Sequence, residues 1–284
     1  MPKHAGLSVK GTYLTEEPAN LLKILYLKRR LKMEVRYFKE YSPSLGRDME
    51  FKVYGHQGKP VLYFPCQAGR FYDFENFHMT DVFAPWIDSG KITVYSVDTI
   101  DNETWADKGG DPRRRIERHE QWYHYLVDEI CPRIADLSGE RNHSYTPIMT
   151  FGCSLGAMHA ANLFFRRPDL FDSVLALSGI YDSSDSFGSY MDDLVYQNSP
   201  CDYIAGMPYN HPYINMYNER RIIVCVGQGA WEDVLKEGTA RLKGVLEHKG
   251  IHAWVDFWGF DVNHDWDWWY RQTAYYLPFL MGEA

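Results

Sequence analysis

The stretch that decides the fold is FGCSLGA, residues 151–157. It carries the pattern Gly-x-Ser-x-Gly around Ser154, between a short apolar run and a helical pattern at residues 155–166. A serine on so sharp a turn needs residues without side chains two positions away on either side, and Gly152 and Gly156 meet that requirement. This strand-turn-helix context predicts a nucleophile elbow. A serine that only caps the helix is the alternative that the five-residue pattern alone permits.

Short apolar or β-branched runs alternate with helical patterns on both sides of this elbow. The predicted strands are residues 33–41, 49–54, 61–64, 92–97, 147–151, 174–178, 222–226 and 253–257. The predicted helices are residues 18–32, 113–134, 155–166, 234–248 and 266–280. Because wholly apolar strands are typical of parallel sheets buried on both faces, we expect an α/β fold with a mostly parallel central sheet of about eight strands flanked by helices.

The chain has 284 residues, of which 45% are apolar, and this suffices for one large domain with its own core. We expect that domain at residues 33–284, after an N-terminal helical extension at residues 1–32. Residues 181–220 are rich in Tyr, Asp, Asn and Pro without clear periodicity. Such a stretch in a compact domain predicts a loop-rich cap over a binding site.

The composition excludes several classes of function. A formal charge of −8 argues against nucleic-acid binding, which depends on Lys and Arg at phosphates. The five scattered cysteines include no CxxC pair and predict neither a disulfide framework nor a zinc site. Neither a signal-peptide pattern nor a membrane-length apolar run occurs, so a cytoplasmic protein is expected. No metal or organic cofactor is predicted, and a homo-oligomer is left open.

Two backbone N–H groups are candidates for binding a negatively charged oxygen. Leu155 begins the helix after the elbow, where unpaired N–H groups and the positive end of the helix dipole meet. A second donor is expected in the loop after the strand at residues 61–64. Gln67 is the candidate there, with Ala68 as the alternative register, and the same segment could equally be only a strand exit.

The base is expected late in the chain, because nucleophile elbows of this type are followed first by an acid and then by a histidine. His264 lies between the last predicted strand and the last helix, where it can reach over the carboxyl edge of the sheet. His248 and His252 fall at the opposite edge. His159 follows Ser154 by five residues, roughly 140° around the helix, and should point away from the serine.

Two acids follow the strand at residues 222–226, and the residues alone do not separate them. Glu232 and Asp233 are both placed to accept the Nδ1 proton of His264 and to stabilise the imidazolium. The acid that is not used for this purpose is expected to lie in the first turn of the following helix, where negative charge is favourable.

Aromatic residues make up 16% of the chain, and several fall in predicted loops. Trp231, Tyr181 and Tyr196 are the candidates for substrate contact, since aromatic rings in loops could stack on a sugar or an aromatic acyl group. Trp105, Tyr190 and Trp258 also lie in predicted loops. Any of these rings could equally be a packing piece of the core.

Four motifs in order give the chain a family resemblance: YSPSLGR at residues 41–47, the elbow GCSLGA, QGAWE at residues 228–232, and HDW from His264 with Trp269 beyond. From residue 33 to 281 the sequence resembles the esterase family of α/β-hydrolases that includes S-formylglutathione hydrolase (esterase D) and the mycolyltransferase antigens of mycobacteria. The resemblance implies an α/β-hydrolase fold and a serine carboxylic-ester hydrolase with a Ser-His-Glu/Asp triad.

The resemblance also assigns roles to individual residues. Esterase D-like spacing places the acid three residues after a Gln-Gly pair, which corresponds to Glu232, and Glu232 is therefore the expected triad acid. Mycolyltransferase-like spacing favours Asp233, which is kept as the alternative. The early oxyanion donor corresponds to Gln67. The loop PCQAG at residues 65–69 differs from the Ser-Gly-Leu-Thr-Cys of S-formylglutathione hydrolases, which argues against a glutathione thioester. The implied substrate is a small or sugar-linked ester, with an acyltransferase or a catalytically silent ligand-binding homologue as the alternatives.

Overall fold

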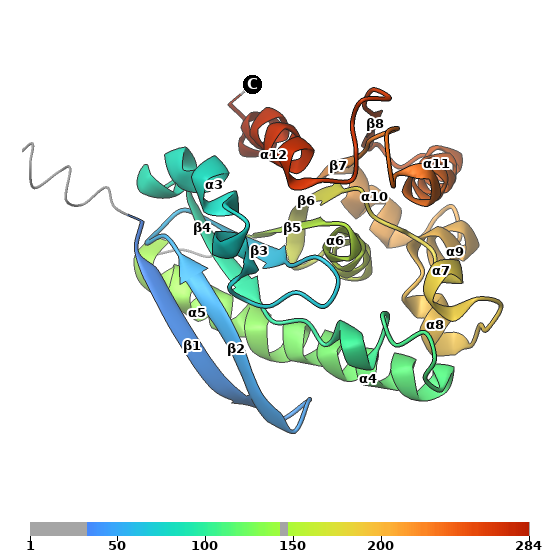
Figure 1. Cartoon of the computed structure of the whole chain (residues 1–284), viewed down its shortest axis with the longest axis horizontal. Helices are drawn as coiled ribbons and strands as arrows, with labels where there is room; N and C mark the ends of the chain where they lie inside the picture. The colour runs from blue at the N-terminus through green and yellow to red at the C-terminus, as the bar shows by residue number, and fades with distance from the viewer. Residues whose placement is uncertain (1–32, 143–146, 284) are drawn as a thin grey trace, which may run out of the picture. The chain divides into compact units, whose positions relative to one another are not determined.

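The computed structural model describes residues 33–142 and 147–283 (Figure 1). The helix predicted at residues 18–32, and with it the N-terminal extension, lies outside the described residues. The eight strands are β1 (Val35–Ser42), β2 (Arg47–Tyr54), β3 (Lys59–Phe64), β4 (Ile92–Val97), β5 (Ile148–Cys153), β6 (Phe171–Leu177), β7 (Arg221–Val226) and β8 (Trp254–Phe257). They form one sheet in the order β1-β2-β4-β3-β5-β6-β7-β8.

The sheet is antiparallel at one side and parallel elsewhere. β1 pairs with β2, and β2 with β4, in antiparallel fashion, and every later pair is parallel. All six side chains of β4 and of β5 are buried, as expected for strands covered on both faces. The predicted mostly parallel α/β sheet is therefore confirmed.

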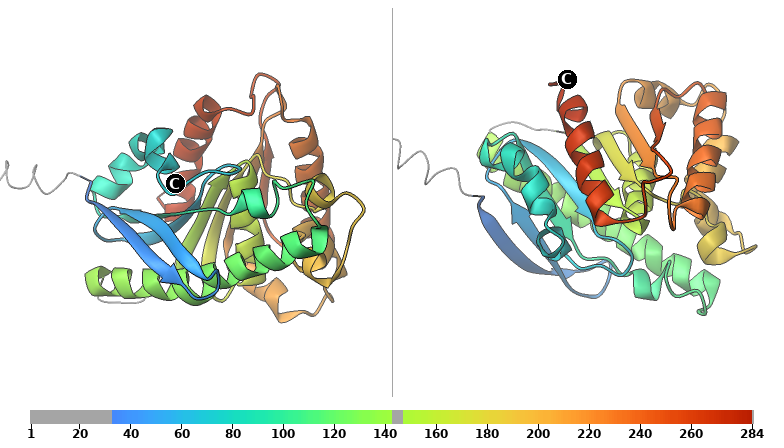
Figure 2. Two further views of the ribbon diagram at one scale, coloured as in Figure 1. Left: turned by 60° about the horizontal axis from the view of Figure 1, so that its bottom comes forward. Right: turned by 45° about the horizontal axis from the view of Figure 1, so that its top comes forward.

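Helices cover both faces of the sheet. On one face α3 (Met79–Asp88) and α12 (Trp266–Met281) pack on a core that contains Phe83, Phe151 and Leu277. The other face is covered by α4 (Pro112–His124), α5 (Cys131–Asn142), α6 (Leu155–Arg166) and α11 (Asp233–His248). The left view of Figure 2 shows α3 and α12 on one side of the strands and α4 and α5 on the other. The sheet thus separates two apolar layers.

The helix predicted at residues 113–134 continues to Asn142, ten residues beyond Pro132. A π-helical stretch, η2 (Tyr125–Ile130), joins α4 to α5, and Pro132 is the second residue of α5. The prediction was too short because a proline near the end of a helical pattern is expected to help end the helix, and Pro132 was interpreted in this way. The wider turns of the π-helical stretch accommodate a residue that lacks an N–H, at a place where the regular hydrogen bonds are already shifted.

The segment predicted as a loop-rich cap contains four short helices joined by loops. They are α7 (Ser184–Phe187), α8 (Asp193–Gln197), α9 (Pro200–Gly206) and α10 (Pro212–Asn218). The prediction also missed α2 (Asp73–Asn76), α3 and the 3-10 turn η1 (Asp101–Glu103). Helices this short carry too little periodicity to stand out in a sequence.

No helix within residues 33–142 and 147–283 combines the length and the apolar character that a membrane crossing demands.

Candidate active site

The parallel strands end at a common edge of the sheet, and the candidate residues follow those ends. Ser154 comes directly after β5, Glu232 lies in the loop after β7, and His264 lies in the loop after β8. The register pairs Phe64 of β3 with Gly152 of β5, so the turn that contains Gln67 begins beside the elbow. Loops at the carboxyl ends of parallel strands are where open α/β sheets bind their ligands.

The backbone at Ser154 has the shape expected of an elbow. Its φ is 57° and its ψ is −129°, a positive-φ conformation outside the αL region that costs a non-glycine residue about 1–3 kcal/mol. A Cβ on Gly152 would lie 2.2 Å from the carbonyl oxygen of Gly156, and one on Gly156 would lie 2.3 Å from that of Phe64. Both glycines are therefore required by backbone contact, as the sequence argument assumed, and their absence of side chains lets α6 start at the elbow.

The imidazole of His264 reaches the serine. Its Nε2 lies 3.0 Å from Ser154 Oγ, and its ring packs edge-on against Trp269 with centroids 4.8 Å apart. The backbone N–H of His264 donates to the carbonyl of Ala230 at 3.0 Å. Asn263 Oδ1 accepts from the N–H of Ala230 at 2.8 Å. These bonds join the loop after β7 to the loop after β8 and hold the imidazole toward the elbow.

Glu232 lies on the far side of that imidazole and is wholly buried. Its Oε2 is 3.5 Å from His264 Nδ1, longer than an ordinary hydrogen bond, and neither atom has another hydrogen-bond partner among the described residues. Its Oε1 accepts from the Ser178 hydroxyl at 2.6 Å, and Ser178 Oγ in turn accepts from Trp269 Nε1 at 3.2 Å. A small rotation of either side chain would bring Oε2 and Nδ1 into contact.

Asp233 has a different environment. It is the first residue of α11, its side chain is 85% exposed, and its carboxylate pairs with Lys236 at 3.3 Å. This is the position expected for the acid that does not contact His264, because negative charge is favourable in the first turn of a helix. Of the two acids left open by the sequence, the fold brings Glu232 toward His264 and leaves Asp233 in solvent.

The candidate oxyanion donors lie on two elements. Leu155 is the first residue of α6, so its N–H has no acceptor within the helix. Gln67 is the second residue of a turn that closes with a 2.8 Å bond from the N–H of Gly69 to the carbonyl of Cys66. The third residue of this turn, Ala68, has a φ of 57°, a position at which type II turns favour glycine.

A small cavity of about 60 Å³ opens beside Ser154. It is lined by Gln67 and Leu155 with the apolar side chains of Trp105, Met158, Ile180 and Leu235 and the polar residues Asp182, Asp185 and Ser186. Three of these residues, 182, 185 and 186, come from the segment predicted as a cap. The volume is far below the roughly 300–1,000 Å³ of sites that hold drug-sized ligands.

The three aromatic residues predicted to contact substrate do not line this cavity. Tyr181 is 0% exposed and packs in the main core, where burial raises the pKa of its hydroxyl well above the ordinary value. Its ring is therefore a packing piece and cannot reach a ligand beside Ser154 in this structure. Tyr196 is 38% exposed on α8, and Trp231 is 86% exposed next to Glu232. Trp105, another of the aromatic residues in predicted loops, is the aromatic residue that lines the cavity.

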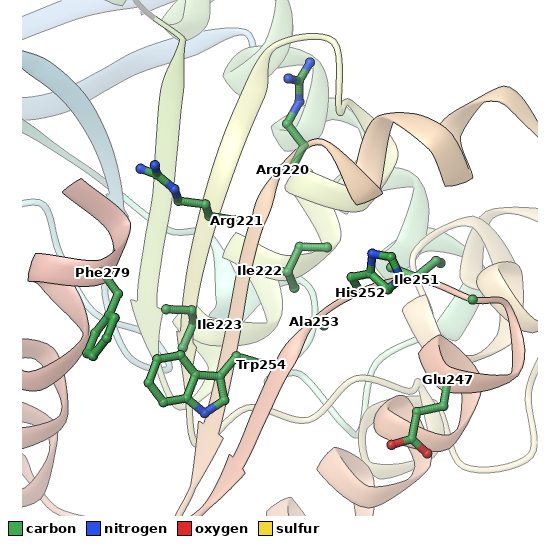
Figure 3. Close-up of a pocket in the computed structure, with 11 residues that line it drawn as sticks. Arg220, Arg221, Ile222, Ile223, Glu247, Ile251, His252, Ala253, Trp254 and Phe279 are labelled. Atoms are coloured by element: carbon green, nitrogen blue, oxygen red, sulfur yellow. The ribbon is translucent and has the colours of Figure 1, made fainter. Parts of the chain in front are cut away.

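The structure also has a larger, more open pocket of about 680 Å³ at the opposite edge of the sheet. Figure 3 shows Arg220, Arg221 and Trp254 there, at the starts of β7 and β8, with His252 beside them. None of its lining residues is a serine, a threonine or a cysteine. This pocket lacks a nucleophile, and its size alone does not make it the reactive site.

Within the described part of the chain, no three His, Cys, Asp or Glu side chains gather as metal ligands. The five cysteines are free thiols, four buried and Cys66 partly exposed. Burial raises the pKa of the Cys66 thiol to about 12, so the thiolate that would act as a nucleophile is scarce. Ser154 is thus the candidate nucleophile with a base in contact.

Comparison with known protein families identifies the group to which the chain belongs. The profile of the family described as "Putative esterase" matches residues 42–278. The chain belongs to this esterase family. This confirms the resemblance read from the four motifs, and membership makes the protein an esterase. No curated protein sequence matches the chain.

Solved structures confirm the α/β-hydrolase fold of this esterase. A ferulic acid esterase has 15% identity and a TM-score of 0.68 over 89% of this chain and 99% of its own. S-formylglutathione hydrolase from Agrobacterium tumefaciens has 14% identity and a TM-score of 0.63 over 88% and 95%. Fluorophosphonate-binding serine hydrolase F from Staphylococcus aureus has 11% identity and a TM-score of 0.63 over 88% and 98%. At these identities the likeness is one of fold.

Two polar residues near the site escaped the sequence argument. Ser178 directly follows β6, and a serine after a buried strand gives no sign that its hydroxyl will meet Glu232. Asp101, in the 3-10 turn after β4, accepts the N–H of Ala68 at 2.9 Å. Its position after a parallel strand is the one signal that could have drawn attention to it.

Proposed function

We propose that this esterase hydrolyses a small carboxylic ester through a covalent acyl-enzyme on Ser154. The observation that carries the proposal is the 3.0 Å contact between Ser154 Oγ and His264 Nε2 at a strained elbow, with the buried carboxylate of Glu232 behind the imidazole. A nucleophile, a base in contact with it and a third group that orients the base are the parts that activate a serine.

The proposed reaction has two steps. Ser154 Oγ attacks the ester carbonyl while His264 Nε2 takes the hydroxyl proton, and the proton then goes to the departing alcohol. A water molecule, deprotonated by the same nitrogen, attacks the acyl carbonyl and returns Ser154 to its free form. The backbone N–H groups of Leu155 and Gln67 are the proposed donors to the oxyanion in both steps.

The size of the cavity supports a short acyl or alcohol group. About 60 Å³, lined on the apolar side by Leu155, Met158 and Leu235, leaves little room for a bulky aromatic acid beside Ser154. We therefore expect acetyl and propionyl esters to be turned over faster than feruloyl esters. An acyltransferase would use the same acyl-enzyme, with an alcohol in place of water.

The decisive test is the variant Ser154→Ala with p-nitrophenyl acetate as substrate and a fluorophosphonate probe. We expect kcat to fall about 10⁴-fold or more and labelling to vanish, since triad serines act as a unit with their base. Ser89→Ala, a change on the exposed end of α3, is the matched control and should keep both signals. Hydrolysis that survives in Ser154→Ala would refute the proposal, and failure of the probe to label the wild-type protein would favour a silent binding homologue.

A second assay separates hydrolysis from acyl transfer. Increasing concentrations of glycerol or glucose are added to the wild-type enzyme with p-nitrophenyl acetate. We expect acetate to remain the main product. Accumulation of the acetylated alcohol would instead identify a transferase that uses the same serine.

A further inference from the structure

One buried carboxylate connects three segments around the elbow. Asp101 Oδ2 accepts the N–H of Ala68 at 2.9 Å, in the turn after β3. Asp101 Oδ1 lies 2.8 Å from His159 Nε2, on the helix that begins next to Ser154. Asp101 itself stands in η1, after β4. Each oxygen of the carboxylate thus contacts a different element of the candidate site.

The pair is enclosed by the protein. The side chains of Asp101 and His159 are 2% and 1% exposed. Because a carboxylate has only acceptors to offer, the proton in this contact belongs to His159 Nε2. The ring is held by Trp122, with centroids 4.8 Å apart, and by His119 at 5.7 Å. His159 was expected to point away from Ser154, and its side chain does not line the cavity.

The bond to Ala68 matters because this residue has an unfavourable backbone conformation. An alanine is unfavourable at a φ of 57°. Rotation of the peptide group before Ala68 by about 180° would convert the turn from type II to type I, which has no positive φ. The N–H that Asp101 accepts belongs to that peptide, between Gln67 and Ala68. Asp101 therefore fixes the peptide plane adjacent to the proposed oxyanion donor, Gln67 N–H.

We propose that Asp101 and His159 are positioning residues that fix the turn at residues 66–69 to the helix of the nucleophile, so that the N–H groups of Gln67 and Leu155 converge on one oxyanion. The inference rests on the proposed function of Ser154. In this proposal His159 takes no part in proton transfer. Its role is to tie α6, the helix that follows Ser154, to the turn at residues 66–69.

The link continues toward the cavity through a second histidine. His119 packs nearly parallel to His159, and its Nδ1 accepts the indole N–H of Trp105 at 3.1 Å. Trp105 lines the cavity with Gln67. Burial, and then the neighbouring His159, hold the pKa of His119 well below its ordinary value. A neutral His119 keeps the acceptor nitrogen that Trp105 needs.

The test compares His159→Phe, which removes the donor, with His159→Gln, whose amide can replace it. Hydrogen exchange of the peptide that covers residues 65–71 reports on the turn without any need for activity. We expect the Ala68 amide to exchange about 10-fold faster in His159→Phe and near the wild-type rate in His159→Gln.

The kinetic readout uses p-nitrophenyl acetate and a trifluoromethyl ketone, which forms a tetrahedral adduct with the serine. In His159→Phe we expect kcat to fall about 10-fold or more with little change in KM, and the inhibitor to bind weaker by the same factor. His159→Gln should recover most of both losses. Asp172→Asn, which breaks the 2.6 Å pair with Lys59 at the amino ends of the strands, is the structural control and should change neither kcat nor exchange at residues 65–71.

The outcomes separate this inference from the proposed function. Wild-type exchange and wild-type kcat in a folded His159→Phe would overturn the positioning role while Ser154 remains the nucleophile. Losses as large in Asp172→Asn would also overturn it, since they would reflect stability alone. If Ser154→Ala retained activity, the proposed function would fail, yet faster exchange of the Ala68 amide would still support the link from His159 to the turn.

Discussion

The two ends of the parallel strands offer two pockets of opposite character. At the carboxyl ends a cavity of about 60 Å³ adjoins Ser154, with His264 Nε2 3.0 Å from the hydroxyl. At the amino ends a pocket of about 680 Å³ presents Arg220, His252 and Trp254. The larger pocket has room for a ligand but no hydroxyl or thiol in its lining, whereas the smaller one adjoins a serine hydroxyl in contact with an imidazole, with the buried carboxylate of Glu232 behind that ring. Size therefore says less about reactivity than the contacts between side chains.

The direction of the chain explains the difference. Each parallel strand delivers its carboxyl end to the same edge, so loops from distant parts of the sequence meet there. The helix that follows β5 begins at that edge and points unpaired N–H groups and its positive end toward Ser154. At the amino ends of the strands the helices have their C-termini, and the negative end of a helix dipole favours cations.

After the loss of Ser154 itself, the largest effect on kcat should come from the buried acid. Glu232→Gln removes the charge behind His264 and should lower kcat by about 10²- to 10⁴-fold, as removal of a triad acid does in other serine hydrolases. Its neighbour Asp233→Asn, changed in the same way on the exposed side of α11, should stay within about twofold. Steady-state kinetics with p-nitrophenyl acetate compare the two. Equal losses of kcat in the two variants would contradict a specific role of the buried Glu232 carboxylate in catalysis.

The next effect concerns the elbow. In Gly156→Ala the new Cβ would lie 2.3 Å from the backbone oxygen of Phe64 and 2.4 Å from that of Pro65, so α6 and β3 must separate. We expect kcat to fall about 10²-fold and the free energy of unfolding to fall by about 1–3 kcal/mol.

The matched control is a second Gly→Ala change, on α11, where the glycine has open space around it. Gly244→Ala places a Cβ with nothing within 4 Å and should raise the free energy of unfolding by about 0.5–1 kcal/mol without changing kcat. Urea unfolding and initial rates measure both quantities. An unchanged kcat in Gly156→Ala would show that the close contact of the elbow with β3 is dispensable.

A smaller effect is expected from pH on the free energy of unfolding, through the buried side chain of His119. Burial first, then His159 and Arg166, lower the pKa of His119 well below 6.5, and the opposing effects of Asp101 and Asn198 do not cancel this. The unfolded chain takes up a proton near pH 6.5 and the folded chain does not, so stability is lost as the pH falls below that value. The expected contribution is up to about 1.4 kcal/mol per pH unit.

Urea unfolding between pH 7.5 and 5.5 tests this dependence. His119→Leu should show a shallower fall of unfolding free energy with decreasing pH than the wild-type protein. An equally steep fall in the variant would assign the acid sensitivity to other groups.

The smallest effect is expected at the large pocket. Arg220→Ala and His252→Ala alter the lining of the pocket at the amino ends of β7 and β8. We expect kcat/KM to change less than about twofold, because surface substitutions distant from a reacting centre act weakly. A loss beyond 10-fold in either variant, measured with p-nitrophenyl acetate, would overturn the contrast between the two edges.

The sequence alone determined the elements with strong local signals. The elbow around Ser154 could be predicted because Gly-x-Ser-x-Gly between a buried strand and a helix has few other uses, and α6 begins and ends where the pattern predicted. The strands at residues 92–97 and 222–226 could be predicted as well, because both runs are rich in apolar and β-branched residues. His264 followed from chain order, since the last loop at the carboxyl edge has one histidine.

Only the tertiary structure decided matters that depend on side-chain direction. Glu232 and Asp233 are adjacent, and the two spacings within the family point to different acids, so only the fold shows which of them turns inward at the start of α11. Tyr181 lies in a segment that reads as a loop, yet its ring is buried in the core. The contact of Asp101 with Ala68 and His159 joins residues 33 and 58 positions apart. Local periodicity specifies strands and helices, whereas burial and long-range hydrogen bonds arise only when the sheet brings the loops together.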